Sequence, residues 1–83
     1  MEIKKYAGKT CVKCKALDRI FKMVTLPCEI ETIYVEDVGE PKFVELGIST
    51  MPTVILSNGG EEIRLEGMIT PKQLQEAIDK LNG

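Results

Sequence analysis

The chain has 83 residues, 43% of them apolar, and a formal net charge of −2, which fits one small ordered domain over residues 1–83. No apolar run approaches the roughly 18 residues of a membrane span, and the N-terminus lacks a signal-peptide stretch, so neither membrane insertion nor export is predicted. The acidic balance and the lack of an aromatic stacking platform interleaved with the lysines argue against nucleic-acid binding.

The cysteine count further narrows the class of protein. Three cysteines are an odd number, whereas a secreted disulfide framework usually has an even one. This predicts a reducing compartment, the cytoplasm, where a pair of cysteines serves redox chemistry or metal binding. The chain has no histidine, which removes histidine general bases and Cys2His2 zinc sites. Charge is uneven: residues 1–23 hold seven basic and two acidic side chains, and residues 24–83 hold four and eleven.

The first half of the chain reads as strand, helix and strand. Residues 2–6 predict a short strand, and 29–35 predict a second from their β-forming residues. Between them, 12–24 shows helical periodicity with one apolar stripe and ends before Pro27. Either Thr10 or Cys11 is expected to cap this helix. The stripe consists of Cys14, Leu17, Phe21 and Val24.

The second half predicts a short helix, a hairpin and a final helix. After a loop at 37–40, a short helix should start at Pro41 and stop at Gly47. The nearly continuous apolar run at 53–57 predicts a strand buried on both faces. A tight turn at Asn58-Gly59-Gly60 should join it to a half-buried strand at 62–66. The last helix starts with a capping box of Thr70, Pro71 and Gln73, followed by Leu74, Ala77, Ile78 and Leu81.

The predicted order is β-α-β-α-β-β-α, which belongs to the α/β class. The first three elements can form a parallel βαβ unit with a right-handed crossover, and the last two strands an antiparallel hairpin. We therefore expect a four-stranded mixed sheet flanked by three helices that pack on both of its faces.

Cys11 and Cys14 are the candidate reactive residues. Two cysteines about one turn apart at a helix start can form a reversible disulfide with little backbone movement. The helix N-terminus and the nearby Lys9, Lys13 and Lys15 should hold the pKa of Cys11 below the ordinary value of about 8.5. Cys11 is thus the predicted nucleophile. Cys14, on the apolar stripe, should be more buried and should resolve the mixed disulfide.

Other interpretations of the cysteines remain. The pair could be half of a metal site, but Cys28 is the only other candidate ligand, so one chain cannot supply the four that structural zinc needs. An inert buried pair is a further alternative. Cys28 itself is expected to be a small, partly buried apolar residue rather than a regulatory thiol.

Three motifs in order resemble the thioredoxin superfamily over nearly the whole chain. They are the CxxC pair after the first strand, the Thr50-Met51-Pro52-Thr53 stretch before a buried strand, and Glu66-Gly67-Met68 before the last helix. The resemblance implies a thioredoxin fold with a cis peptide bond at Met51-Pro52, in a loop that packs beside the cysteines. It further implies that substrate contacts come from Val12, Lys13, Met51, Pro52 and Gly67.

The resemblance leaves the branch of the superfamily open. The length is similar to glutaredoxins, whereas the stretch around Met51-Pro52 is more similar to thioredoxins, and Val12-Lys13 is typical of neither. Glutaredoxins often hold glutathione with acidic residues after the glycine equivalent to Gly67, whereas the uncharged Met68-Ile69-Thr70 follows it here. We expect a cytoplasmic, monomeric protein-disulfide reductase without a cofactor or bound metal. Its partners would be disulfide-containing proteins and either a thioredoxin-reductase-type donor or glutathione. The alternatives are a glutathione-dependent glutaredoxin and a CxxC soft-metal-binding module.

Overall fold

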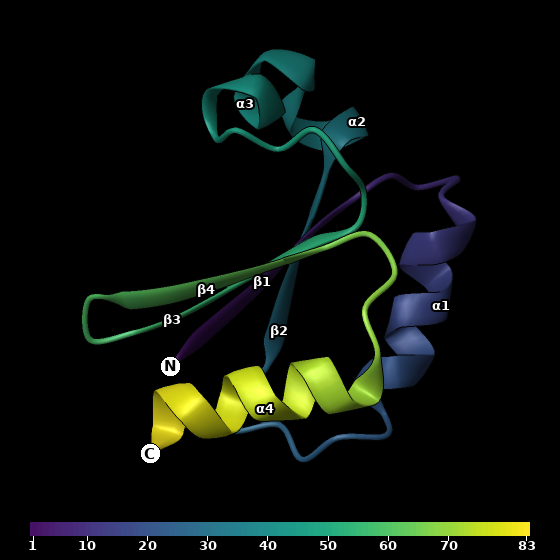
Figure 1. The fold of residues 1–83 in the computed structure, drawn as a ribbon. Coiled ribbons are helices and arrows are strands. Elements are labelled where there is room, and N and C mark those ends of the chain that lie inside the picture. The colour runs from purple at the N-terminus through teal and green to yellow at the C-terminus, as the bar shows by residue number, and fades with distance from the viewer.

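The structure, a computed structural model, describes residues 1–83 as a four-stranded sheet with helices on both faces (Figure 1). In chain order, the elements are β1 (Glu2–Ala7), α1 (Val12–Phe21), β2 (Ile30–Tyr34), α2 (Val35–Val38), α3 (Glu40–Glu45), β3 (Thr53–Asn58), β4 (Glu61–Glu66) and α4 (Pro71–Asn82). No helix combines the length and the apolar character that crossing a bilayer requires.

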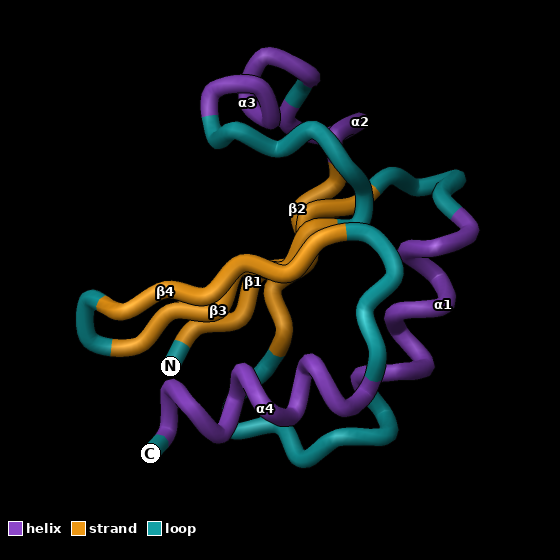
Figure 2. Tube along the Cα trace, viewed as in Figure 1, coloured by secondary structure: helices purple, strands orange, loops and turns teal.

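The strands lie in the order β2-β1-β3-β4, which is the mixed sheet that the sequence predicts (Figure 2). β1 pairs parallel with β2, as a βαβ crossover requires, and antiparallel with β3. β3 and β4 form the predicted hairpin, in which Asn58 pairs with Glu61 across the turn. Because β1 and β3 run antiparallel, the segments after β1 and before β3 meet at one edge of the sheet.

Each face of the sheet has its own apolar cluster. α1 and α4 cover one face, over a core that includes Ile3, Leu17, Val54, Leu56, Leu74 and Ile78. On the other face, which α3 covers, the rings of Tyr6 and Phe43 meet edge to face with their centroids 5.6 Å apart, and Ile48 packs beside them. The alternation along β1 sends Ile3 to the first cluster and Tyr6 to the second, so the predicted packing on both faces is confirmed.

Two details differ from the sequence prediction. α1 ends at Phe21 rather than at Val24, because Lys22 and Met23 turn their N–H groups to the carbonyls of Arg19 and Ile20, three residues back. Residues 35–38, part of which was expected to be loop, form the single helical turn α2. Gly39, at φ +90°, separates this turn from α3, a conformation that favours glycine.

The C-terminal helix begins as predicted. The Thr70 hydroxyl accepts a hydrogen bond from the Gln73 N–H at 3.1 Å, and the Gln73 side chain accepts one from the Thr70 N–H at 3.0 Å. This reciprocal pair satisfies two of the N–H groups that a helix start leaves unpaired. The capping box therefore confirms the predicted start of α4.

Candidate functional site

The cysteine pair lies at the N-terminus of α1, at the end of the loop that follows β1 (Figure 1). Cys11 and Cys14 are joined by a disulfide, with their Cα atoms 5.2 Å apart. Cys11, rather than Thr10, is the N-cap: its sulfur accepts a hydrogen bond from the Cys14 N–H at 3.2 Å. Cys11 is partly exposed and Cys14 only 2% exposed, so one sulfur is open to a partner and the other lies in the core.

One of the three lysines expected to act on Cys11, Lys9, is paired with acidic side chains. The ammonium group of Lys9 pairs with Asp37 at 2.8 Å, and this hydrogen bond, with the carboxylate's charge, raises the pKa of the Lys9 amine. The backbone N–H of Lys9 also donates to the Glu36 carboxylate, and its nitrogen lies 3.1 and 3.2 Å from the two carboxylate oxygens. Because acidic partners offset its charge, we expect Lys9 to stabilise a Cys11 thiolate less than the sequence predicts. It instead connects the loop before the cysteines to α2.

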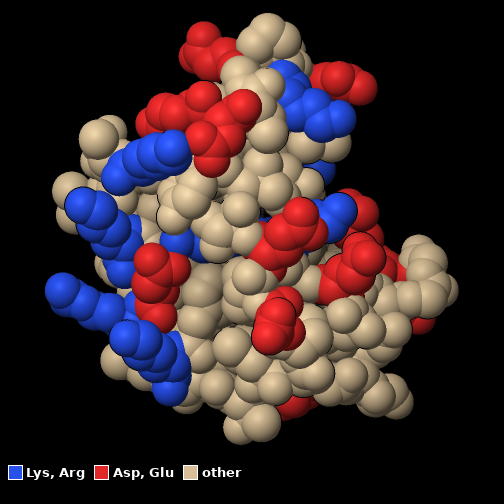
Figure 3. All heavy atoms as spheres, turned by 180° about the vertical axis from the view of Figure 1, so that it is seen from behind, with Lys and Arg blue, Asp and Glu red and all other residues tan.

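Four further basic residues lie along α1 and its C-terminal cap. The basic residues of this helix and its cap are exposed, and Figure 3 shows basic side chains gathered along one edge of the molecule, with acidic ones above them. Lys13 lies between the two cysteines, and Lys22 lies at the far end of the helix. Lys13 is therefore the basic residue best placed to favour an anion at Cys11.

Reversing this charge should weaken the Cys11 thiolate. In reduced Lys13→Glu, we expect the pKa of Cys11 to rise and its thiolate fraction at pH 7 to fall roughly two- to fivefold, a modest effect because the side chain is exposed to solvent. The measurement is the ultraviolet absorbance of the thiolate against pH. Lys22→Glu makes the same charge change at the other end of α1 and is the matched control. Indistinguishable titrations of the two variants would contradict this role.

The loop before β3 forms one side of the site. The Met51-Pro52 peptide bond is cis, in agreement with the resemblance, and the Pro52 ring is buried. Two hydrogen bonds fix the loop: the Thr53 hydroxyl donates to the Thr50 carbonyl at 2.6 Å, and the Gly67 N–H donates to the Pro52 carbonyl at 2.9 Å. The segments around Pro52 and Gly67, distant in sequence, are therefore held together at the cysteine edge.

Gly8 is a site residue that the sequence indicates only as part of a loop. A Cβ atom added at Gly8 would lie 3.4 Å from the Met51 methyl carbon and 3.6 Å from the Cys11 Cβ. Met51 thus lies across Gly8 and beside the first cysteine. The available signal was a glycine placed shortly before the CxxC pair, which suits close approach by another side chain.

Three exposed apolar side chains lie on the segments that meet at the cysteine edge of the sheet, and we call them the apolar collar: Val12, Met51 and Met68. Val12 is 80%, Met68 74% and Met51 36% exposed. A small groove lined by Lys13, Gly67 and Met68, among others, runs along α1 from this collar. The structure therefore brings together all the residues predicted for the site, although the Pro52 ring is covered. Met68 is a further exposed neighbour, which the resemblance quoted only as part of a motif.

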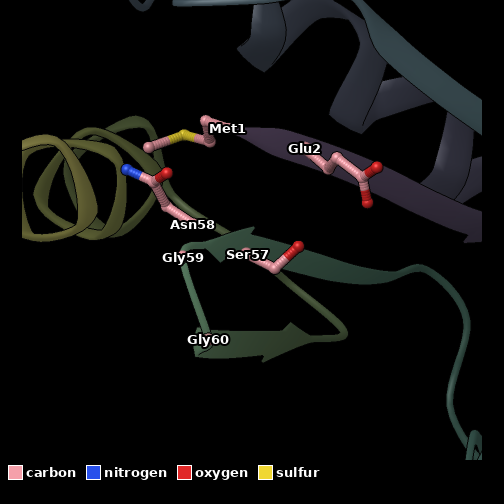
Figure 4. Close-up of a pocket in the computed structure, with 6 residues that line it drawn as sticks. All are labelled: Met1, Glu2, Ser57, Asn58, Gly59 and Gly60. Carbon is pink, nitrogen blue, oxygen red and sulfur yellow. The ribbon is translucent and has the colours of Figure 1, made fainter.

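Other features lie away from this site. A shallow hollow of about 240 Å³ lies at the opposite end of β1, lined by Met1, Glu2 and the hairpin turn (Figure 4). It contains none of the predicted site residues. Cys28 is a free, partly buried thiol packed against the larger core. Nowhere do three or more cysteine or acidic side chains gather in a way that could hold a metal ion.

Comparison with known proteins agrees with this geometry. The model of a family described as "Thioredoxin domain" matches residues 1–79. A comparison with curated protein sequences gives no significant match. Among solved structures, a mutant thioredoxin from Halobacterium salinarum superposes with a TM-score of 0.80 at 18% identity, covering 98% of this chain and 74% of that one.

Two further solved structures are similar over nearly the whole chain. A Malassezia sympodialis thioredoxin has a TM-score of 0.74 at 25% identity, covering 98% of this chain and 74% of its own. Thioredoxin 1 from Thermosipho africanus has a TM-score of 0.73 at 24% identity, covering 96% of this chain and 92% of its own. These likenesses establish the fold that holds the cysteine pair.

Proposed function

Because this chain belongs to the thioredoxin domain family, we propose that it is a thiol-disulfide oxidoreductase that reduces disulfides in other proteins. The Cys11 thiolate attacks a substrate disulfide and forms a mixed disulfide. Cys14 then attacks the Cys11 sulfur and releases the reduced substrate, which leaves the Cys11–Cys14 disulfide. An external donor restores the dithiol.

The observation that carries this proposal is the asymmetry of the pair. Both cysteines are close enough to form a disulfide, yet only Cys11 is open to solvent, at a helix N-terminus where backbone N–H groups and the helix dipole favour an anion. An attacking thiolate must be accessible, and a resolving thiol must be near it but protected. The alternative metal-binding module would have a βαββαβ order, whereas α2 and α3 lie between β2 and β3 in this chain.

The substrate is proposed to be an extended protein segment lying across the apolar collar. Val12, Met51 and Met68 offer apolar contacts to such a segment, and the Met51 side chain lies beside Cys11. Lys13 and Gly67 border the same surface. Apolar contacts around one reactive sulfur suit varied protein segments, because they demand little of the substrate's polar groups.

The donor and the cellular setting follow from the same proposal. Either a thioredoxin-reductase-type enzyme or glutathione would regenerate the dithiol, with no bound cofactor in this chain. The segment after Gly67 has no charged side chain until Lys72, which argues against a glutathione site. The odd number of cysteines supports a reducing compartment such as the cytoplasm, where we propose that the chain works as a monomer.

The test is catalysed reduction of insulin. With dithiothreitol as donor, the protein should accelerate insulin precipitation above the rate of dithiothreitol alone. The donor is then varied: NADPH with thioredoxin reductase against glutathione with glutathione reductase and NADPH. Faster turnover with thioredoxin reductase is expected. Preference for glutathione would assign the chain to the glutaredoxin alternative, and no acceleration with any donor would reject the proposal.

A further inference from the structure

A lysine lies buried beneath the helix that holds the cysteines. Lys5, in the middle of β1, is only 2% exposed, and its ammonium group lies 2.6 Å from the Asp18 carboxylate on α1. It occupies the face of β1 that Ile3 and Ala7 share, toward the larger core. Its partner is much more open, since the Asp18 side chain is 57% exposed. The charge on Lys5 is therefore on the inner side of this ion pair.

The ion pair lies close to Cys14. Asp18 follows Cys14 by four residues on α1, so the two side chains are neighbours on one helix face, about 6 Å apart at Cβ. The Lys5 ammonium group contacts Asp18 from inside, where Cys14 also lies, since both Lys5 and Cys14 are 2% exposed. The buried cation and the buried sulfur thus occupy the same layer, between β1 and α1.

Packing alone does not account for this arrangement. Removing the Lys5 ammonium group from water has a large desolvation cost, which an apolar side chain at this position would avoid. The neighbours of Lys5 across the sheet include Val54, which is fully buried and would suit an apolar partner. A cation kept in this layer therefore calls for a role that an apolar side chain could not perform.

We propose that Lys5 is a positioning residue for the resolving step: its buried ammonium group favours the thiolate form of Cys14, and Asp18 holds it in place. This inference rests on the proposed function. In the mixed disulfide, Cys14 loses its proton to solvent and its sulfur attacks the Cys11 sulfur. The Cys11–Cys14 bond forms as the bond to the substrate sulfur breaks, and that sulfur leaves as a thiolate and takes a proton from water. Two electrons pass from the dithiol to the substrate disulfide.

Few other charged groups surround Cys14. On its own helix these are Cys11, Asp18 and the exposed Lys13 and Lys15. The Thr50–Thr53 and Gly67–Ile69 segments, which border the site, contain no titratable side chain. From the sheet, Lys5 is the charged residue on this face of β1, because Lys4 points to the opposite face. A change in Cys14 titration on substitution of Lys5 can therefore be assigned to that charge.

The test measures each thiol separately. Cys14 is titrated in a Cys11→Ser background and Cys11 in a Cys14→Ser background, each with Lys5, Lys5→Met or Lys5→Gln. The Cys14 thiolate fraction at pH 7 should fall about threefold or more in both Lys5 variants. A unit charge buried in the same layer acts strongly on the thiol even when Asp18 partly offsets it. Cys11, which has the helix terminus and solvent nearby, should change less. Lys4→Met, one position along the same strand, is the matched control.

The outcomes separate the two proposals. A shift confined to Cys14, together with slower release of a thiol from the preformed mixed disulfide, supports the role of Lys5. Unchanged titrations, or equal shifts at both cysteines, would overturn it, because a merely structural role disturbs the whole site. Circular dichroism checks folding, and Lys5→Gln keeps the test usable if Lys5→Met does not fold. The titration needs no substrate, so it stands even if insulin reduction fails.

Discussion

Cys11→Ser should abolish insulin reduction and leave only the rate of the donor alone. The hydroxyl of serine remains protonated at neutral pH and does not attack a disulfide, whereas the thiol it replaces has a helix N-terminus and Lys13 nearby to favour its thiolate. Cys14 cannot substitute as the attacking group, because it is almost fully buried. The measurement is insulin turbidity with dithiothreitol, compared with a reaction without protein.

The third cysteine provides the matched control for this variant. Cys28 is a free thiol on the loop before β2, packed against the core and outside the site. Cys28→Ser should keep the wild-type rate, with at most a small loss of stability from placing a hydroxyl there. Wild-type activity in Cys11→Ser, or loss of activity in Cys28→Ser alone, would show that the nucleophile has been assigned to the wrong cysteine.

Local patterns were sufficient to predict most of the fold. The capping box at Thr70 and the apolar spacing after it place α4 within a residue of its observed ends, because both signals lie within one helix. The strand at 53–57 and its turn were equally clear, since a continuous apolar run followed by Asn58-Gly59-Gly60 has few other solutions. The βαβ handedness and the hairpin then restrict the sheet orders that fit the elements, and the observed order is one of these.

What the sequence did not predict depends on contacts between distant residues. α1 ends early where a tight turn replaces the last helical turn and the Thr25 N–H donates to the Gln75 side chain, fifty residues away. The Lys9 charge could be counted from the sequence, but its pairing with Asp37 could not. Likewise, Lys5 could be counted as a basic residue of the first strand, but its burial against Asp18 could not be predicted.

In the site, too, features within one segment were predicted from the sequence, whereas contacts between distant segments were not. The CxxC spacing and the helix start predict the relation between Cys11 and Cys14, because both belong to one turn of chain. That Met51 lies over Gly8 beside Cys11 follows from the antiparallel pairing of β1 with β3, which brings the segments after one strand and before the other together. Only the resemblance to thioredoxins indicated this meeting in advance, and it did not indicate Gly8.

Cys14→Ser should stop the reaction halfway, at a covalent complex with the substrate. Cys11 remains accessible in this variant and can still attack, but the group that would release the substrate is a hydroxyl. Reduced Cys14→Ser, mixed with oxidised insulin in the absence of small thiols, should therefore accumulate a mixed disulfide. A non-reducing gel or intact-mass measurement would detect it, and dithiothreitol should remove it.

The double variant Cys11→Ser/Cys14→Ser, which keeps Cys28, is the control and should form no such complex. If Cys14→Ser instead releases free reduced substrate without an added thiol, another group resolves the mixed disulfide and the assignment of Cys14 is wrong.

Addition of glutathione makes the experiment more informative. If glutathione restores full turnover to Cys14→Ser, Cys14 is dispensable with that donor, which favours the glutaredoxin alternative. If turnover stays low, the reaction depends on the buried sulfur one helical turn from Cys11, as the burial of Cys14 and its bond to Cys11 lead us to expect.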